Sequence, residues 1–227
     1  MEKEFWLERW ARNEIGFHQG DINPHLRRFW HEAAPASGRV FVPLCGKSRD
    51  LLWLRDQGRP VLGVELSAIA ARAFFEENGL TPVQQSKPPF ESFEARGVEI
   101  LCGDFFDLDA AHLKDVSAVY DRAALVALPP ELRTRYAAHL AAILPSDTRL
   151  LLVTFDYDQK EMVGPPFSVP VAEVEALFAG RAAIRQLASI DALADNPRFR
   201  ERGASRIEEH VFLLTVDKPR NHSAPPP

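Results

Sequence analysis

Short, uniformly apolar runs alternate with helix-like segments between residues 38 and 155. The runs lie at 40–44, 61–66, 98–105, 116–121 and 149–157, and apolar residues at helical spacing occupy 47–58, 67–79 and 131–144. Strands separated by helices of this length are typical of a mostly parallel α/β sheet. Because the runs are continuous rather than alternating, we expect strands that are buried on both faces.

Two of the helices have recognisable ends. Ser67 precedes one helix as an N-cap and Gly79 follows it as a C-cap, while Pro129 and Pro130 open another.

The segments on either side of residues 38–155 have a different sequence pattern. Residues 2–13 are predicted to form an amphipathic helix with Phe5, Trp6 and Trp10 on or near one face. The proline-interrupted segment 80–97 is expected to be a loop or edge segment, and 156–170 a surface loop. A helix at 171–179 and strands near 182–190 and 207–216 complete a sheet of seven strands. We expect one domain over residues 1–217 and a disordered tail over 218–227.

Composition narrows the class of protein. The 227 residues include 27 basic and 32 acidic side chains, a net charge of −5, which argues against a nucleic-acid-binding face. The N-terminus is too charged for a signal peptide, and no apolar run reaches the roughly 18 residues of a membrane span. Cys45 and Cys102 form no CxxC pair and the histidines have no metal-ligand spacing. We therefore expect a cytoplasmic monomer with reduced thiols, no metal and no membrane or nucleic-acid partner.

Chemically useful residues stand where the predicted strands end. Ligands of open α/β sheets bind outside the carboxyl ends of the strands. Glu65 ends the second strand, about 20 residues after the first strand-to-helix turn, where nucleoside-binding proteins place an acid for the ribose hydroxyls. The alternative, an exposed loop glutamate, fits less well with its apolar neighbours.

The first turn, Pro43 to Gly46, carries neither GxGxxG nor a phosphate loop, because Phe41 stands where the phosphate loop needs glycine. Without these glycines a backbone cannot approach a pyrophosphate closely. This disfavours a nicotinamide dinucleotide and favours a nucleoside cofactor without phosphates, such as S-adenosylmethionine.

Two further strand ends are ambiguous. Asp104 and Phe105 are placed to meet an adenine edge and face, but an N-cap aspartate is equally compatible with the spacing. Asp121 and Arg122 form a charge pair after the fourth strand, which a structural ion pair also explains.

The sequence as a whole resembles the thiopurine S-methyltransferase family, most closely its bacterial branch. The likeness covers residues 4 to 216 and rests on EFWLERWARNEIGFHQGDINPHL, VFVPLCGKSRDLLWL, GVELS, FFEENGL, GDFFDL and YDRAALVALPPELR. It implies the class I S-adenosylmethionine-dependent methyltransferase fold, with seven strands, helices on both faces and an N-terminal helical lid over residues 1–35.

The resemblance also implies roles for individual residues on the cofactor side. Trp10 matches the lid aromatic that packs on S-adenosylmethionine, Leu44 a backbone contact, and Glu65 the acid that holds the ribose hydroxyls. Asp104 and Phe105 match the adenine-side positions.

On the acceptor side, the resemblance implies that Arg122 lines both cofactor and substrate and that Phe17 lies beside the acceptor. One of Arg198, Arg200 and Arg202 is expected to supply a second substrate-side arginine.

The implied reaction is in-line methyl transfer to the sulfur of an aromatic or heterocyclic thiol, giving S-adenosylhomocysteine. Such thiols ionise near neutral pH, so no strong protein base is required, and Asp121 is a weaker candidate for that role than for a structural one. Three alternatives stay open at this point: selenium or tellurium oxyanions as acceptors, small thiols or halides, or a non-catalytic module that binds adenosyl ligands.

Overall fold

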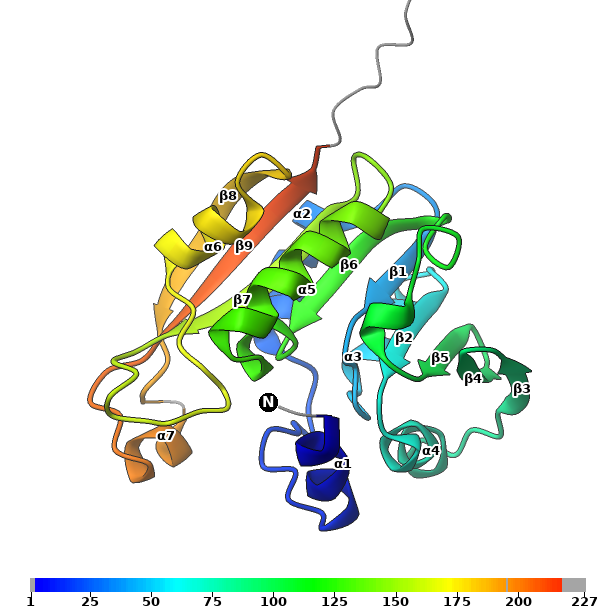
Figure 1. Ribbon diagram of the computed structural model, residues 1–227, viewed down its shortest axis with the longest axis horizontal. Helices are drawn as coiled ribbons and strands as arrows, with labels where there is room; N and C mark the ends of the chain where they lie inside the picture. The colour runs from blue at the N-terminus through cyan, green and yellow to red at the C-terminus, as the bar shows by residue number, and fades with distance from the viewer. Residues whose placement is uncertain (1–2, 195, 218–227) are drawn as a thin grey trace, which may run out of the picture.

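The computed structural model describes residues 3–194 and 196–217. Within these ranges nine strands form one sheet in the order β3-β4-β5-β2-β1-β6-β7-β9-β8 (Figure 1). The strands are β1 (Arg39–Val42), β2 (Val61–Glu65), β3 (Val83–Lys87), β4 (Phe90–Ala95), β5 (Val98–Cys102), β6 (Val116–Arg122), β7 (Arg149–Asp156), β8 (Ala182–Asp191) and β9 (Glu208–Val216).

The centre of the sheet is parallel and its two edges are antiparallel. Strands β5, β2, β1, β6 and β7 pair in parallel, whereas β3, β4, β8 and β9 join through antiparallel ladders. The chain winds outward from β1 in both directions, first through β2 and then through β6. This reversal is the place where open α/β sheets bind ligands.

Helices cover both faces of the sheet, as expected (Figure 1). On one face α5 (Pro130–Ile143) and α6 (Val171–Phe178) pack with the short 3-10 turns η1 (Phe105–Asp107) and η2 (Leu125–Ala127). On the other face lie α2 (Pro24–Ala33), α3 (Asp50–Asp56) and α4 (Ala68–Glu77). Two further helices, α1 (Lys3–Ala11) and α7 (Pro197–Glu201), lie beyond the end of the sheet at which the parallel strands finish.

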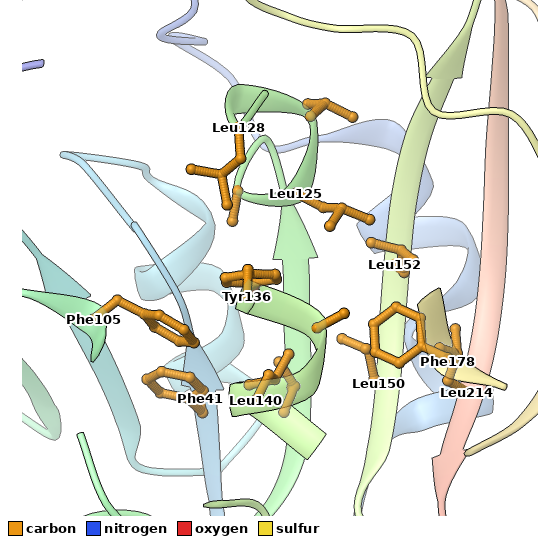
Figure 2. Close-up of a cluster of buried hydrophobic side chains, with 14 of the residues drawn as sticks. Phe41, Phe105, Leu125, Leu128, Tyr136, Leu140, Leu150, Leu152, Phe178 and Leu214 are labelled. Carbon is orange, nitrogen blue, oxygen red and sulfur yellow. The ribbon is translucent and has the colours of Figure 1, made fainter. Parts of the chain in front are cut away.

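Strand β7 shows why the apolar runs are continuous. Leu150 and Leu152 point into the core beneath α5 and α6, and Leu151 and Val153 point into the core beneath α2. Figure 2 shows the first of these cores, where Tyr136 and Leu140 of α5 meet Leu150 and Leu152 of β7 and Phe41 of β1. Truncating one such buried leucine to alanine costs about 2–5 kcal/mol of stability.

The sequence prediction of seven strands is too low by two. Segment 80–97, predicted as a loop or edge segment, lies at the edge of the sheet, where it forms the hairpin β3–β4 beside β5. Pro88 and Pro89 interrupt the pattern only at the turn, and Phe90 and Phe93 bury their rings on the sheet. The prolines therefore mark the turn of a hairpin.

The helix ends follow the expected signals. The hydroxyl of Ser67 accepts a hydrogen bond from the backbone N–H of Ala70 at 3.4 Å, and Gly79 follows α4 with φ of +63°.

The N-terminal segment divides into two parts. Helix α2 buries Leu26 and Trp30 against the sheet, so this part of residues 1–35 belongs to the core. Only residues 3–23 lie where a lid is expected. The predicted tail at 218–227 lies outside the described residues. Among the helices of the described ranges, none is both long and apolar enough to cross a membrane.

Candidate active site

The turn after β1 has a strained backbone. Leu44 has φ of +46° and Gly46 has φ of +53°, so the chain turns twice through the left-handed region within three residues. That conformation costs a residue with a Cβ about 1–2 kcal/mol. The turn is held because the backbone N–H of Cys45 donates to the carbonyl of Val64 on β2 at 3.0 Å. Strain maintained in this way is typical of functional sites.

Glu65 lies at the end of β2 and joins the turn after β1 to the start of α4. Its Oε2 accepts the backbone N–H of Gly46 at 2.8 Å, and its Oε1 accepts that of Ser67 at 2.7 Å. Only 6% of the residue is exposed. Each carboxylate oxygen keeps a second lone pair, so the group can accept further hydrogen bonds from a ligand's hydroxyls.

Burial raises the pKa of Glu65 from 4.5 to about 7, although the backbone hydrogen bonds from Ser67 and Gly46 favour its charged form. The carboxylate is thus held near its titration point at neutral pH. Donors that favour the ionised form lower the pKa again.

Trp10 of α1 lies directly over the first turn. A Cβ added at Gly46 would meet the Trp10 ring at 3.2 Å, so a larger residue would require the indole to shift by a few tenths of an ångström. The Phe17 ring stands edge-on to Trp10 at 5.6 Å and to Trp6 at 5.5 Å. An aromatic cluster therefore covers the turn whose N–H group binds Glu65.

Asp104 ties α1 to the turn after β5. Its Oδ2 lies 2.5 Å from Nζ of Lys3, while Oδ1 accepts the backbone N–H of Phe106 at 2.9 Å. The N-cap role considered from the sequence is therefore present, together with an ion pair to α1. Phe105, by contrast, turns its ring into the core, 4.7 Å from the ring of Tyr136 (Figure 2). Its side chain serves packing in this arrangement.

Arg122 ends β6, beside β1 at the reversal of strand order. It is partly exposed, and no ion pair involves it in the described part of the chain. The next residue, Ala123, has φ of +72°, a second strained position at a central strand end. An arginine without a carboxylate partner is available to an electron-rich ligand.

Asp121, next to Arg122, turns its carboxylate into the core. Its Oδ2 accepts the hydroxyl of Tyr136 at 2.7 Å, and its Oδ1 accepts the backbone N–H groups of Ala124 and Leu125 at 3.3 and 3.2 Å. Burial raises its pKa to about 6 against these hydrogen bonds. The group holds the turn after β6 to α5.

The three C-terminal arginines reach different segments. Arg198 donates to the carbonyl of Gly16 at 2.7 Å, and Arg202 donates to that of Pro165 at 3.2 Å. Arg200 donates to Leu193, within its own part of the chain, at 3.4 Å. Arg198 and Arg202 therefore border the same end of the sheet as Arg122, and Arg200 is the weakest candidate.

Sequence reasoning missed one buried group at this end of the sheet. Asp50 accepts the backbone N–H of Asn23 at 2.9 Å and the hydroxyl of Tyr120 at 3.2 Å. It thereby connects the end of the N-terminal loop to the strand that carries Arg122. No spacing rule distinguishes this aspartate from an ordinary residue at a helix start.

Three kinds of side chain lie at the ends of neighbouring central strands. A buried carboxylate, an aromatic cover and an unpaired arginine converge on the ends of β1, β2 and β6. In the described ranges no group of three or more His, Cys, Asp or Glu residues is arranged to hold a metal ion. The polar groups at this end of the sheet therefore lie next to the aromatic side chains of α1 and the loop that follows it.

Comparison with known proteins adds the family. A family model described as Thiopurine S-methyltransferase matches residues 1–217. A thiopurine S-methyltransferase of Nitrosospira multiformis is 60% identical over 215 residues, which cover 94% of this chain and 98% of the relative. One of Azotobacter vinelandii is 53% identical and covers 94% and 99%.

A solved structure agrees on the fold. The 1,6-didemethyltoxoflavin-N1-methyltransferase of Burkholderia thailandensis, with bound S-adenosylhomocysteine, superposes with a TM-score of 0.63 at 16% identity, covering 95% of this chain and 87% of that one.

Proposed function

The chain belongs to the thiopurine S-methyltransferase family, and on that premise we propose that it transfers a methyl group from S-adenosylmethionine to the sulfur of aromatic and heterocyclic thiols such as thiopurines. The alternative acceptors, and a module without turnover, gain no support from any observation in the structure.

The observation that carries this proposal is the buried Glu65 beneath Trp10. Two ribose hydroxyls can donate to its carboxylate, whose raised pKa leaves it ready to be stabilised by such donors. The indole over Gly46 offers an apolar wall next to these hydroxyls. The donor set therefore fits a nucleoside with a free 2′,3′-diol, and no part of it is arranged for phosphates.

The acceptor is proposed to lie between Phe17 and Arg122. Phe17 offers a ring face or edge to an aromatic thiol, and the guanidinium attracts a thiolate or an electron-rich ring nitrogen. Such a charge-assisted hydrogen bond contributes about 1.5–3 kcal/mol. Arg198 and Arg202 are the candidates for a second arginine, because both bond to segments at this end of the sheet.

The chain's contribution to the reaction is chiefly orientation and exclusion of water. When bound, S-adenosylmethionine supplies an electrophilic methyl group next to a positive sulfur. Aligning a thiolate with that methyl at about 3–3.5 Å is worth several kcal/mol of the barrier. Residues 3–23, as the proposed lid, cover the site with aromatic side chains, and a low-polarity cover suits a reaction in which opposite charges neutralise each other.

We propose that residues 1–217 act as one domain and as a monomer on small molecules, in a cytoplasm that keeps thiols reduced. Cys45 and Cys102 flank Glu65 and both are free thiols.

The direct test is methylation of 6-mercaptopurine with S-adenosylmethionine, read as methylated product against a blank without acceptor. We expect product from the wild-type chain and almost none from Glu65→Ala. A folded protein that binds S-adenosylhomocysteine, seen as a thermal shift, but yields no product with any aromatic thiol would reject the proposed acceptor class while keeping the cofactor.

A further inference from the structure

The loop that joins α1 to α2, residues 12–23, is fixed in place by several elements. Contacts hold it at four points: Arg198 to the carbonyl of Gly16 (2.7 Å), Arg49 to that of Gly20 (3.0 Å), Asp50 to the N–H of Asn23 (2.9 Å), and Trp10 to the ring of Phe17 (5.6 Å). We call residues 12–23 the pinned loop, because these contacts fix its backbone and therefore the positions of its side chains. Besides Phe17, the central residue of this loop is His18.

The imidazole ring of His18 has no polar partner in the described part of the chain. The residue is half-buried, and its backbone N–H donates to the carbonyl of Ile15 at 2.8 Å. Four of the other rings take part in hydrogen bonds or ion pairs: His25 with Glu209, His31 with Glu32, His112 with Asp109, and His210 with Gln186. The Nε2 of His139 also lacks a hydrogen bond within the described residues, but this atom is buried and the ring serves packing against Phe105 and Phe106. Both ring nitrogens of His18 are thus available to a ligand.

The charges around His18 are mostly positive. The positive charges of Lys47, Arg49 and Arg122 lower the pKa of His18, and the negative charge of Glu77 raises it. Glu77 is itself paired with Lys47 at 2.6 Å, which offsets its effect. Burial, followed by these cations, lowers the pKa of His18, so its imidazole is neutral at pH 7 and can accept a proton.

We propose that His18 is the proton acceptor for those thiol substrates that are still protonated at neutral pH, a role that rests on the proposed methyl transfer. Its position in the pinned loop, next to Phe17 and within the field of Arg122, places it on the acceptor side of the site.

The step balances as follows. The S–H bond of the thiol breaks, its proton moves to a ring nitrogen of His18, and the electron pair stays on sulfur. That pair forms the new S–CH₃ bond as the bond from methyl to the sulfonium sulfur breaks, with its electrons left on S-adenosylhomocysteine. The imidazolium then loses its proton to solvent, which the surrounding cations favour.

The experiment compares an aromatic thiol with an alkyl thiol that carries a phenyl ring, two acceptors of different acidity, at pH 7. 4-Nitrobenzenethiol is ionised, whereas phenylmethanethiol is an alkyl thiol and, like cysteine with a pKa of about 8.5, is largely protonated. For His18→Gln we expect kcat/KM to fall about 10²-fold with phenylmethanethiol, the lower end of general-base contributions, and less than about threefold with 4-nitrobenzenethiol. Raising the pH toward 9 should restore the variant's rate with phenylmethanethiol. His31→Gln, at an exposed histidine, is the matched control and should leave both rates unchanged.

Several results would overturn the proposal. An equal loss of kcat/KM with both thiols would indicate a structural role for His18. Wild-type kcat/KM with both thiols would exclude His18 from proton transfer. A wild-type chain that methylates 4-nitrobenzenethiol but not phenylmethanethiol would also exclude a protein base. Failure of the wild-type chain with both thiols and with 6-mercaptopurine would instead reject the proposed function.

Discussion

Replacing Glu65 by glutamine perturbs the cofactor site with the smallest change in shape. In the wild-type protein, burial raises the pKa of Glu65 from 4.5 to about 7. That difference corresponds to about 3 kcal/mol of folding stability, fully present below pH 4.5 and lost as the pH rises through about 7. Glutamine does not titrate, so the unfolding free energy of the variant should lose this component of its pH dependence.

Cofactor binding should show the opposite trend with pH. Ribose hydroxyls donate to the ionised carboxylate, so the affinity for S-adenosylhomocysteine should fall up to about tenfold per pH unit below about 7. Hydrogen bonds to a charged acceptor are worth about 1.5–3 kcal/mol, which predicts a roughly 10²-fold weaker Kd for Glu65→Gln at pH 8.

Isothermal titration calorimetry between pH 5.5 and 8 measures both the Kd of S-adenosylhomocysteine and the protons released when it binds. In the wild-type protein the binding enthalpy near pH 7 should vary with the ionisation enthalpy of the buffer, because binding releases a proton. In Glu65→Gln this variation and the pH dependence of Kd should both vanish. Wild-type affinity in the variant, or an unchanged proton release, would refute the ribose assignment.

Three further substitutions test the surrounding site. Arg122→Ala should lower turnover of an aromatic thiol about 10- to 100-fold through the lost charge-assisted hydrogen bond, with little change in Tm, and steady-state kinetics with an unchanged rate would remove it from the site. Asp104→Asn breaks the ion pair with Lys3, which is mostly exposed, so we expect the stability of α1 to fall by about 1 kcal/mol or less. The loss should appear as faster amide hydrogen exchange in α1 at low salt, and exchange as slow as in the wild type would show that the pair does not hold the helix. Asp121→Asn should lower Tm through its weakened bond to Tyr136 and leave the Kd of S-adenosylhomocysteine unchanged, and a loss of affinity would contradict a structural role.

The sequence pattern was sufficient to locate the central strands and the chemistry at their ends. Buried strands carry their own signal in uniform apolar runs, and in a parallel sheet each strand end falls at the same edge. That is why Glu65 and Arg122 could be placed at the same edge of the sheet without any knowledge of contacts. The family resemblance then supplied the cofactor, which spacing alone left open.

What could not be predicted depends on contacts distant in the sequence. The β3–β4 hairpin is concealed by two prolines that lie in its turn, and α2 is a core helix because of what it packs against. The ring of Phe105 turns into the core because Tyr136 lies there, 31 positions later in the chain. Asp50 and His18 likewise acquire their significance only from residues brought to them by the fold.

The two buried carboxylates, Glu65 and Asp121, show why a perturbed pKa alone does not identify a functional group. Burial raises both values, to about 7 and about 6, and in both cases backbone N–H groups oppose it. They differ in their partners: Asp121 accepts the Tyr136 hydroxyl within the core, whereas Glu65 binds the turn after β1, which the aromatic cluster of α1 and the following loop covers from outside the sheet. A partner that is part of the core remains when a ligand binds, but a helix outside the sheet can move aside. The stability that Asp121 contributes through its raised pKa is lost as the pH rises through about 6. Its titration should therefore change the free energy of unfolding and not the Kd of the cofactor, whereas the titration of Glu65 should change both.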